Sequence, residues 1–224
     1  MWLKLRNIKK SYLNGNRRIQ VLRGIDLEVN KGEKIAIVGP SGSGKTTLLN
    51  IIGTLDRPDE GEIFFEGRPI EWQNDAFLSH FRGKKLGFVF QFYHLMPELN
   101  VKENILLPGL MAGWERSKLE ERVQDLLSRL SLEDKKDSRI YALSGGERQK
   151  VAIARAVFLY PELLLADEPT GNLDPESAKE VIELFLELNK TLHLSLIIVS
   201  HNMEIAKRMD KLYLLKEGFL VEYS

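Results

Sequence analysis

The stretch that decides the fold is Gly39-Pro40-Ser41-Gly42-Ser43-Gly44-Lys45-Thr46, which fits the pattern G-x-x-x-x-G-K-T. It follows an uninterrupted apolar run, Lys34 to Val38, that is typical of a buried parallel strand, and it precedes an apolar helix candidate, Thr47 to Ile52. Glycines let backbone N–H groups curl around a phosphate at the positive end of a helix. The sequence therefore predicts a phosphate-binding loop, in which Lys45 bridges nucleotide phosphates and the Thr46 hydroxyl ligates Mg²⁺.

A second apolar strand ends in two carboxylates, because Leu163 to Ala166 is followed by Asp167 and Glu168. Acidic residues at a strand end are commonly solvated, but the phosphate-binding loop upstream favours a functional interpretation. Asp167 is placed to bind the magnesium ion through its waters, and Glu168 to polarise the water that attacks the γ-phosphate. Hydrolysis of the nucleotide, beyond its binding, follows from Glu168.

The segment Leu143 to Gln149, here called the signature segment, predicts the start of a helix, because Ser144 and Glu147 make a capping box. The alternative interpretation of this segment is a plain helix cap. A Ser hydroxyl and the bare N–H groups of Gly145 and Gly146 at a positive helix end also form an anion site. The chain thus carries two helix ends suited to phosphate.

Outward from these motifs, apolar strands alternate with amphipathic helices, which favours an α/β fold with a mostly parallel sheet covered by helices. Residues 1 to about 34 alternate in the strand manner and predict an antiparallel β lobe, with a polar loop over residues 13–18. Residues from about 100 to 140 have a helical period and predict a helical insertion. Ser117 and Glu120 predict a capping box at the start of its main helix.

Composition excludes several classes of protein. The 224 residues are 43% hydrophobic, which suits one large soluble α/β domain. Lys plus Arg number 32 and Asp plus Glu also number 32, so no overall basic charge attracts nucleic acid, and no nucleic-acid partner is expected. The chain has no cysteine, which excludes disulfides, Cys-ligated zinc, iron–sulfur clusters and thiol catalysis.

The sequence also bears on location. The alternating start, Met1 to Arg6, lacks the apolar stretch of a signal peptide, so we expect the chain to stay in the cytoplasm. No apolar run approaches the roughly 18 residues that span a bilayer. Any link to a membrane is therefore expected to come through a partner.

With the three motifs in this order and spacing, the sequence resembles the nucleotide-binding domains of ABC (ATP-binding cassette) transporters over essentially all of its length. The resemblance implies a P-loop NTPase fold of the ABC type, with ATP and Mg²⁺ as cofactors and ATPase activity coupled to transport. It implies a single domain over 1–224, with a core at 1–90 and 145–224 and a helical subdomain at about 91–144. In that family the signature segment of one subunit contacts the γ-phosphate held by the other, which implies a homodimer in the ATP-bound state.

The resemblance assigns further positions one at a time. Tyr12 matches the aromatic that stacks on adenine, Gln91 the glutamine that reaches magnesium and the attacking water, and His201 the histidine that contacts the γ-phosphate. Asp174 matches the loop that crosses the dimer interface, although an Asp before a Pro is also a plain helix cap. The expected catalytic residues are Lys45, Gln91, Glu168 and His201, and the expected metal-binding residues are Thr46, Gln91 and Asp167. The expected nucleotide-binding residues are Tyr12, Gly39, Pro40, Ser41, Gly42, Ser43, Gly44, Lys45, Thr46, Thr47, Ser144, Gly145, Gly146 and Asp174.

The resemblance also points to a membrane partner. The segment Gln91 to Trp114, here called the docking segment, lies where the family receives the coupling helix of an integral membrane permease. Its aromatic and aliphatic residues suit a docking groove, and packing between the helical and core parts is the alternative. The chain is thus expected to be peripheral on the inner face of the cell membrane, held there by the permease.

A finer similarity points to the subfamily that serves lipoprotein release. It is carried by Glu168 to Asp174, with its Gly-Asn pair, by Leu86 to Pro97 and by Ser200 to Met209. Macrolide-type exporters and the cell-division ATPase share most of these motifs and remain alternatives. A P-loop kinase gives no reason for the signature segment. A DNA-acting ABC ATPase normally carries a long coiled coil, whereas fewer than 60 residues, without heptads, separate Gln91 from Ser144.

Overall fold

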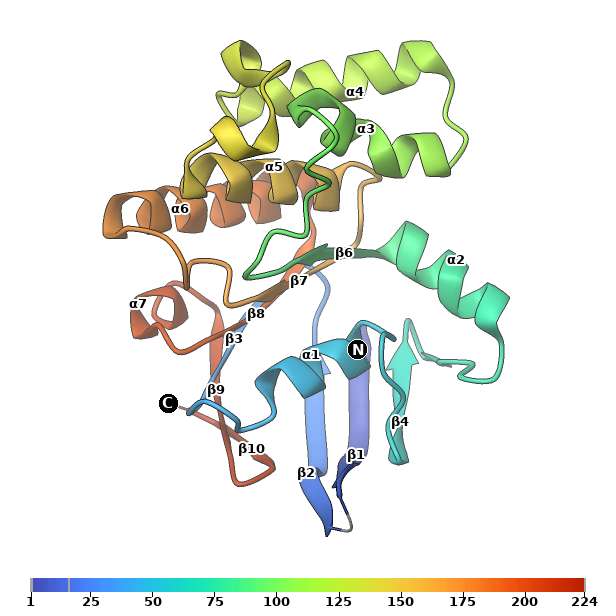
Figure 1. Ribbon diagram of the computed structural model, residues 1–224. Helices are drawn as coiled ribbons and strands as arrows, with labels where there is room; N and C mark the ends of the chain where they lie inside the picture. The colour runs from blue at the N-terminus through green and yellow to red at the C-terminus, as the bar shows by residue number, and fades with distance from the viewer. Residues whose placement is uncertain (1, 16, 224) are drawn as a thin grey trace.

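The computed structural model describes residues 2–15 and 17–223, which form two sheets and the helices around them (Figure 1). One sheet has six strands in the order β10-β9-β3-β8-β7-β6, and the other has four in the order β2-β1-β4-β5. The strands are β1 (Leu3–Asn14), β2 (Arg17–Val29), β3 (Lys34–Val38), β4 (Glu60–Phe65), β5 (Arg68–Pro69), β6 (Leu86–Val89), β7 (Leu163–Asp167), β8 (Ser195–Ser200), β9 (Lys211–Lys216) and β10 (Phe219–Glu222). The helices are α1 (Lys45–Ile52), α2 (Asp75–Lys85), α3 (Val101–Met111), α4 (Arg116–Arg129), η1 (Glu133–Lys135), η2 (Ile140–Ala142), α5 (Gly145–Val157), α6 (Pro175–Leu192) and α7 (Met203–Ala206).

The six-stranded sheet is mostly parallel, as predicted. β3 pairs in parallel with β8 and β9, and β7 with β6 and β8, while β10 returns antiparallel to β9. All six residues of β8 are buried, because α5 and α6 cover one face of the sheet and α1 lies against the other (Figure 1). Parallel strands end at the same edge, so the segments that follow β3, β7 and β8 meet there.

The antiparallel lobe is also confirmed, since β1 pairs with both β2 and β4. Its buried side chains share one apolar core with α1 and with that face of the large sheet. The predicted polar loop over residues 13–18 is wrong in extent, because the ladder continues through the pairs Leu13–Arg18 and Asn14–Arg17. Backbone hydrogen bonds hold this exposed end of the hairpin whatever the polarity of its side chains.

The helical insertion consists of α3, α4 and two short 3₁₀ turns, which pack on α5 (Figure 1). The predicted capping box of Ser117 and Glu120 is wrong. The helix α4 begins at Arg116 and is preceded by Glu115, whose side chain makes no capping hydrogen bond. Glu120 instead pairs with Lys102 of α3, with 2.7 Å between carboxylate and ammonium. Within residues 2–15 and 17–223, no helix has both the length and the apolar character that crossing a membrane requires.

Candidate nucleotide-binding site

Three strand ends of the large sheet open onto one cleft of about 680 Å³. The phosphate-binding loop follows β3, β7 ends at Asp167 with Glu168 directly after it, and His201 follows β8. The cleft is lined by Tyr12, Val21, Ser41, Gly42, Gly44, Lys45, Thr46, Thr47, Gln91, Glu168 and His201. Most of the residues that the sequence singles out therefore lie around a single cavity.

The phosphate-binding loop needs its glycines. Gly42 and Gly44 have φ of +76° and +101°, which residues with a Cβ rarely adopt. A Cβ on Gly39 would lie 2.3 Å from the carbonyl oxygen of Leu215, so only glycine fits against β9. The hydroxyl of Ser43 is buried in this loop and has no hydrogen-bond partner among the described residues. A buried donor of this kind fits a loop that is completed by an anion.

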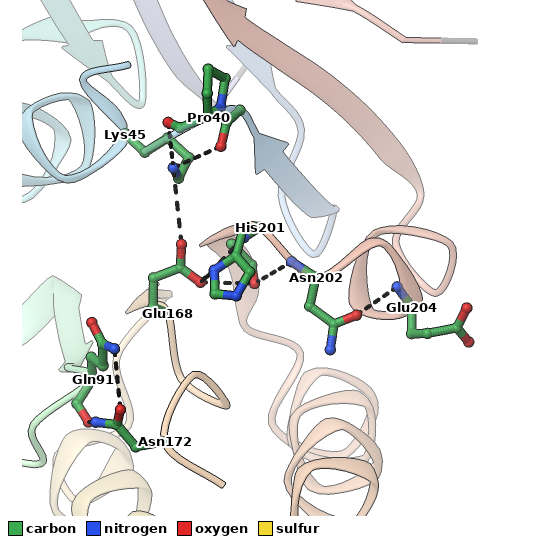
Figure 2. A network of polar contacts seen from close by, with 10 residues as sticks. Pro40, Lys45, Gln91, Glu168, Asn172, His201, Asn202 and Glu204 are labelled. Atoms are coloured by element: carbon green, nitrogen blue, oxygen red, sulfur yellow. Dashed lines mark hydrogen bonds and ion pairs between the residues drawn. The ribbon is translucent and has the colours of Figure 1, made fainter. Parts of the chain in front are cut away.

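Lys45 extends across the loop from the first turn of α1. Its ammonium donates to the carbonyl oxygens of Gly39 (2.9 Å) and Pro40 (3.1 Å), and it lies 3.9 Å from a carboxylate oxygen of Glu168 (Figure 2). The side chain is nearly buried, with 9% of its surface exposed. A buried positive charge at the N-terminus of a helix is suited to bind phosphate.

Asp167 has the electrostatics of a cation ligand. Burial raises the pKa of its carboxyl, and the neighbouring charge of Glu168 adds to this, while a hydrogen bond with Thr46 and the charge of Lys45 act in the opposite direction. A divalent cation would stabilise the ionised form that burial disfavours. No described group of three or more His, Asp or Glu could hold a metal alone. Thr46 and Asp167 thus fit Mg²⁺, which is usually bound by one or two protein oxygens together with substrate phosphates.

Glu168 is held in a strained and specific position. Its φ is +44°, in the left-handed region that residues other than glycine avoid, and such strain is characteristic of functional sites. Its backbone N–H donates to the carbonyl oxygen of Val199 (2.9 Å). One carboxylate oxygen accepts from the Ser200 hydroxyl (3.0 Å) and lies 2.9 Å from Nδ1 of His201 (Figure 2). The carboxylate and the imidazole therefore act as one hydrogen-bonded unit at the mouth of the cleft.

Ser200 is a residue of this unit that the sequence analysis missed. It is fully buried at the end of β8, and its hydroxyl also accepts from the N–H of Asn202 (3.1 Å). A polar residue closing an apolar strand beside His201 was the available signal. Through its hydrogen bond from the end of β8, Ser200 orients the Glu168 carboxylate.

Gln91 follows β6 and is tied to the loop after β7. Its side-chain amide donates to Oδ1 of Asn172 (3.3 Å), and the amide of Asn172 donates to the backbone carbonyl of Gln91 (3.2 Å) (Figure 2). This reciprocal pair of hydrogen bonds holds Gln91 at the cleft wall. Asn172 belongs to the same loop as Glu168, so the pair also ties Gln91 to the segment that carries Glu168. The Gly-Asn pair quoted from the sequence thus contacts the predicted glutamine directly.

Tyr12 reaches the cleft from β1 of the antiparallel lobe. Its hydroxyl donates to Oδ2 of Asp56 (2.6 Å), and Lys10 donates to Oδ1 of the same carboxylate (2.5 Å) and to the carbonyl oxygen of Arg57 (2.6 Å). Burial and the hydrogen bond with Asp56 raise the pKa of Tyr12. Sequence analysis missed Lys10 and Asp56, because the contact joins residues more than 40 positions apart.

Seven of the predicted nucleotide-binding residues do not line this cleft. Three of them belong to the phosphate-binding loop itself, namely Gly39, Pro40 and Ser43, and the other four are Ser144, Gly145, Gly146 and Asp174. The predicted capping box at Ser144 is confirmed, since its hydroxyl accepts from the N–H of Glu147 (3.2 Å) and its own N–H donates to the Glu147 carboxylate (2.7 Å). That hydrogen bond keeps the pKa of Glu147 low. Asp174 caps α6 by accepting from the N–H groups of Glu176 and Ser177. The helices α5 and α1 lie on opposite faces of the large sheet (Figure 1).

Comparisons with known proteins agree with this geometry. The family described as ABC transporter matches residues 22–171. The lipoprotein-releasing system ATP-binding protein LolD of Syntrophus aciditrophicus is 44% identical over 98% of both chains. The post-hydrolysis dimer of the ATP-binding cassette MJ0796, bound to ADP and Pi, is 36% identical, with a TM-score of 0.90 over 99% of this chain and 98% of that one. The protein cbiO1 of Clostridium perfringens, part of the ABC transporter complex cbiONQ, is 30% identical, with a TM-score of 0.88 over 98% of this chain and 86% of that one.

Proposed function

We propose that this chain, which belongs to the ABC transporter family, powers lipoprotein release through a separate membrane permease. The chain is an ATP-binding subunit of that family and hydrolyses ATP, which it binds with Mg²⁺. The observation that carries the finer proposal is the 44% identity to a lipoprotein-releasing ATPase over 98% of both chains. That similarity extends beyond the nucleotide motifs and includes the docking segment.

The cleft supports a division of roles among its residues. The N–H groups of the phosphate-binding loop and the Lys45 ammonium bind the β- and γ-phosphates, and the Tyr12 ring stacks on the base. Thr46, Gln91 and Asp167 hold the magnesium ion, which supplies neutralisation of the phosphate charge. Glu168 polarises the attacking water, and His201 contacts the γ-phosphate. Phosphoryl transfer to water needs positioning and charge neutralisation more than covalent chemistry, and these side chains provide both.

We infer that the site is composite and that a second copy of the chain completes it. Ser144, Gly145 and Gly146 form a helix end suited to an anion, and they do not line the cleft of their own chain. In a head-to-tail homodimer this helix end would close the cleft of the partner over the γ-phosphate. The structure of the relative MJ0796, which is dimeric with ADP and Pi bound, supports a dimer. ATP then stabilises the dimer through contacts that ADP lacks, and hydrolysis opens it.

The docking segment is the proposed contact with the permease. It exposes large apolar side chains that stay outside the core, namely Phe92 (70%), Met96 (48%), Leu110 (55%) and Met111 (82%). Leu95, by contrast, packs against the core. In this proposal residues 91–144 form a helical subdomain that receives the permease, and the chain lies in the cytoplasm, peripheral on the inner face of the cell membrane. Phe92 directly follows Gln91, so docking and nucleotide chemistry share one short segment.

Changing Phe92 to Ser should separate the two activities. Because the side chain is exposed, we expect the free energy of unfolding to change by no more than about 0.5 kcal/mol. ATPase activity of the isolated chain should stay within about twofold of normal, which corresponds to about 0.4 kcal/mol of activation free energy. Binding to the permease should fall at least about tenfold, because a truncated interface anchor typically costs 1–2 kcal/mol or more. Co-purification of the permease and ATP-driven release of a lipid-anchored lipoprotein from proteoliposomes are the measurements.

A matched control is Leu13→Ser, which removes an equally exposed apolar side chain from the far end of the β1–β2 hairpin. It should retain both permease binding and release. Full permease binding by Phe92→Ser would contradict the docking proposal. Vesicles that keep the lipoprotein but export a macrolide-type compound would reject lipoprotein release and favour the exporter alternative.

A further inference from the structure

The last turn of α5 carries a half-buried positive charge, Arg155, whose hydrogen bonds go to backbone carbonyls. The guanidinium of Arg155 donates to the carbonyl oxygens of His94 (2.7 Å) and Tyr93 (2.9 Å). Burial lowers the pKa of Arg155, and no ion pair to a carboxylate is found for it among the described residues. Even partial burial of a charge without a counter-ion costs free energy, and the two carbonyl oxygens offset that cost.

The carbonyls that Arg155 holds belong to a strained turn. Tyr93 and His94 have φ of +60° and +49°, so two consecutive residues other than glycine are left-handed. Such a turn persists only when its surroundings hold it, and the two hydrogen bonds from Arg155 do so. Gln91 lies two positions before Tyr93, and the N–H of Tyr93 donates to the carbonyl oxygen of Phe90 (3.1 Å), which spans Gln91. The conformation of the turn therefore fixes the position of Gln91 in the segment after β6.

The same turn also lies beside the other end of α5. A Cβ placed on Gly145, in the first turn of that helix, would lie 3.4 Å from the hydroxyl oxygen of Tyr93. Tyr93 thus runs along α5, with its carbonyl held by Arg155 and its hydroxyl next to the signature segment. A displacement of α5 reaches Gln91 through this residue.

We propose that Arg155 is a positioning residue that couples the signature helix to Gln91 by holding the Tyr93–His94 turn. The inference rests on the proposed function, because it requires Gln91 to act on the magnesium ion and the attacking water. When a partner's nucleotide engages the N-terminus of α5, Arg155 transmits the displacement to the turn and so to Gln91. Loss of the two hydrogen bonds leaves ATP bound but Gln91 misplaced.

A purely structural role is the rival explanation, and the chain offers a matched control for it. Arg122 is more deeply buried than Arg155 and pairs with Asp125. Its guanidinium donates to the carbonyl oxygens of Phe158 (3.1 Å) and Val157 (2.8 Å) at the same end of α5. Burial lowers the pKa of Arg122 too. It contacts neither Tyr93 nor His94 through any hydrogen bond of the described residues. Arg122→Lys therefore disturbs the same helix end without touching the turn.

The experiment compares Arg155→Lys, Arg122→Lys and Gln91→Ala in the full chain, by thermal unfolding and by ATPase rate against ATP and Mg²⁺ concentration. Both Lys variants should lower Tm, and Arg122→Lys should lower it more, because Arg122 is more deeply buried and also pairs with Asp125. Arg155→Lys should lower kcat at least about tenfold with KM for ATP within about twofold, the pattern of a lost transition-state contact. Arg122→Lys should keep kcat within about twofold of normal. The double variant of Gln91→Ala with Arg155→Lys should be no slower than Gln91→Ala alone, because both changes act through one side chain.

Adding His94→Gly to Arg155→Lys supplies a second readout, because glycine adopts positive φ without strain and the turn then needs less support. We expect this variant to regain kcat at least about threefold over Arg155→Lys. Equal loss of kcat in both Lys variants, additive losses in the double variant, or no gain from His94→Gly would overturn the coupling. If Gln91→Ala is slow but Arg155→Lys is not, only this inference fails. If Gln91→Ala is fully active, the role proposed for Gln91 fails, and this inference with it.

Discussion

Replacing Glu168 with Gln should slow ATP hydrolysis by about 10²-fold or more, which is the typical loss when a general base is removed. The amide keeps the shape of the side chain and still accepts hydrogen bonds from Ser200 and His201, which hold the carboxylate in place. It has no negative charge to polarise the attacking water. ATP binding should therefore survive, and the ATP-bound dimer should accumulate because hydrolysis no longer opens it.

Single-turnover kinetics measure the rate of hydrolysis, and size-exclusion chromatography with ATP and Mg²⁺ measures the amount of dimer. Glu176→Gln is the control, because this exposed glutamate in the first turn of α6 makes no contact with the cleft. It should hydrolyse ATP at the normal rate and elute as the unchanged protein does. An unchanged hydrolysis rate in Glu168→Gln would remove Glu168 from the mechanism.

Lys45→Met should lower the affinity for ATP, whereas Glu168→Gln should lower the rate of hydrolysis and leave ATP bound. The ammonium is nearly buried and is held at the phosphate-binding loop by the carbonyls of Gly39 and Pro40. Truncating one partner of a buried charge pair typically costs at least 2–5 kcal/mol, and about 3 kcal/mol corresponds to a loss of affinity of about 10²-fold. Hydrolysis and the ATP-dependent dimer should be lost together, in contrast to Glu168→Gln.

Equilibrium binding of ATP in the presence of Mg²⁺ measures this directly. The control is Lys34→Met at the opposite end of β3, where the lysine pairs with Asp210 at 2.8 Å and lies outside the cleft. Its loss should lower the free energy of unfolding and leave the affinity for ATP unchanged. Normal ATP affinity in Lys45→Met would contradict the assignment of the phosphate site to this loop.

The parts of the fold that depend on local pattern could be predicted from the sequence. β3, the loop after it and α1 are contiguous, and a buried strand, fixed glycines and a helix start follow one another within about 20 residues. Capping boxes were predicted less well, because each depends on one residue having an extended backbone conformation. Ser144 with Glu147 and Ser117 with Glu120 have the same spacing, yet Ser117 lies inside α4, because the helix starts earlier. The spacing alone does not determine which residue adopts the extended cap conformation.

Two other elements were not predicted for a related reason. Only Leu78 and Phe81 of α2 are buried, so its helical period is weak. The β9–β10 hairpin has exposed residues on most of β10 and lacks the strict alternation of a half-buried strand. Both elements are stabilised by neighbours that come from distant parts of the chain.

In the candidate site, too, the sequence predicted some residues but not the contacts that support them. Residue types at strand ends and the resemblance together indicated Tyr12, Gln91, Glu168 and His201, and the structure places all four around one cleft. The supporting contacts were not predictable, because Asp56 under Tyr12 and Ser200 behind Glu168 become neighbours only after the sheets assemble. The left-handed conformations of Glu168 and of the Tyr93–His94 turn also result from tertiary contacts and leave no local pattern.

The central claim is that the signature segment of one chain completes the cleft of another, and cysteine cross-linking tests it most directly. The chain has no cysteine, so single cysteines placed by Ser41→Cys and Ser144→Cys, each in the Glu168→Gln background, have no competing thiol. The account predicts that a short bismaleimide joins the two variants into a covalent dimer only when they are mixed and only with ATP and Mg²⁺. Either variant alone, or the mixture with ADP, should stay uncross-linked. A mixture that gives no covalent dimer with ATP, or one that forms equally well with ADP, would contradict the composite site.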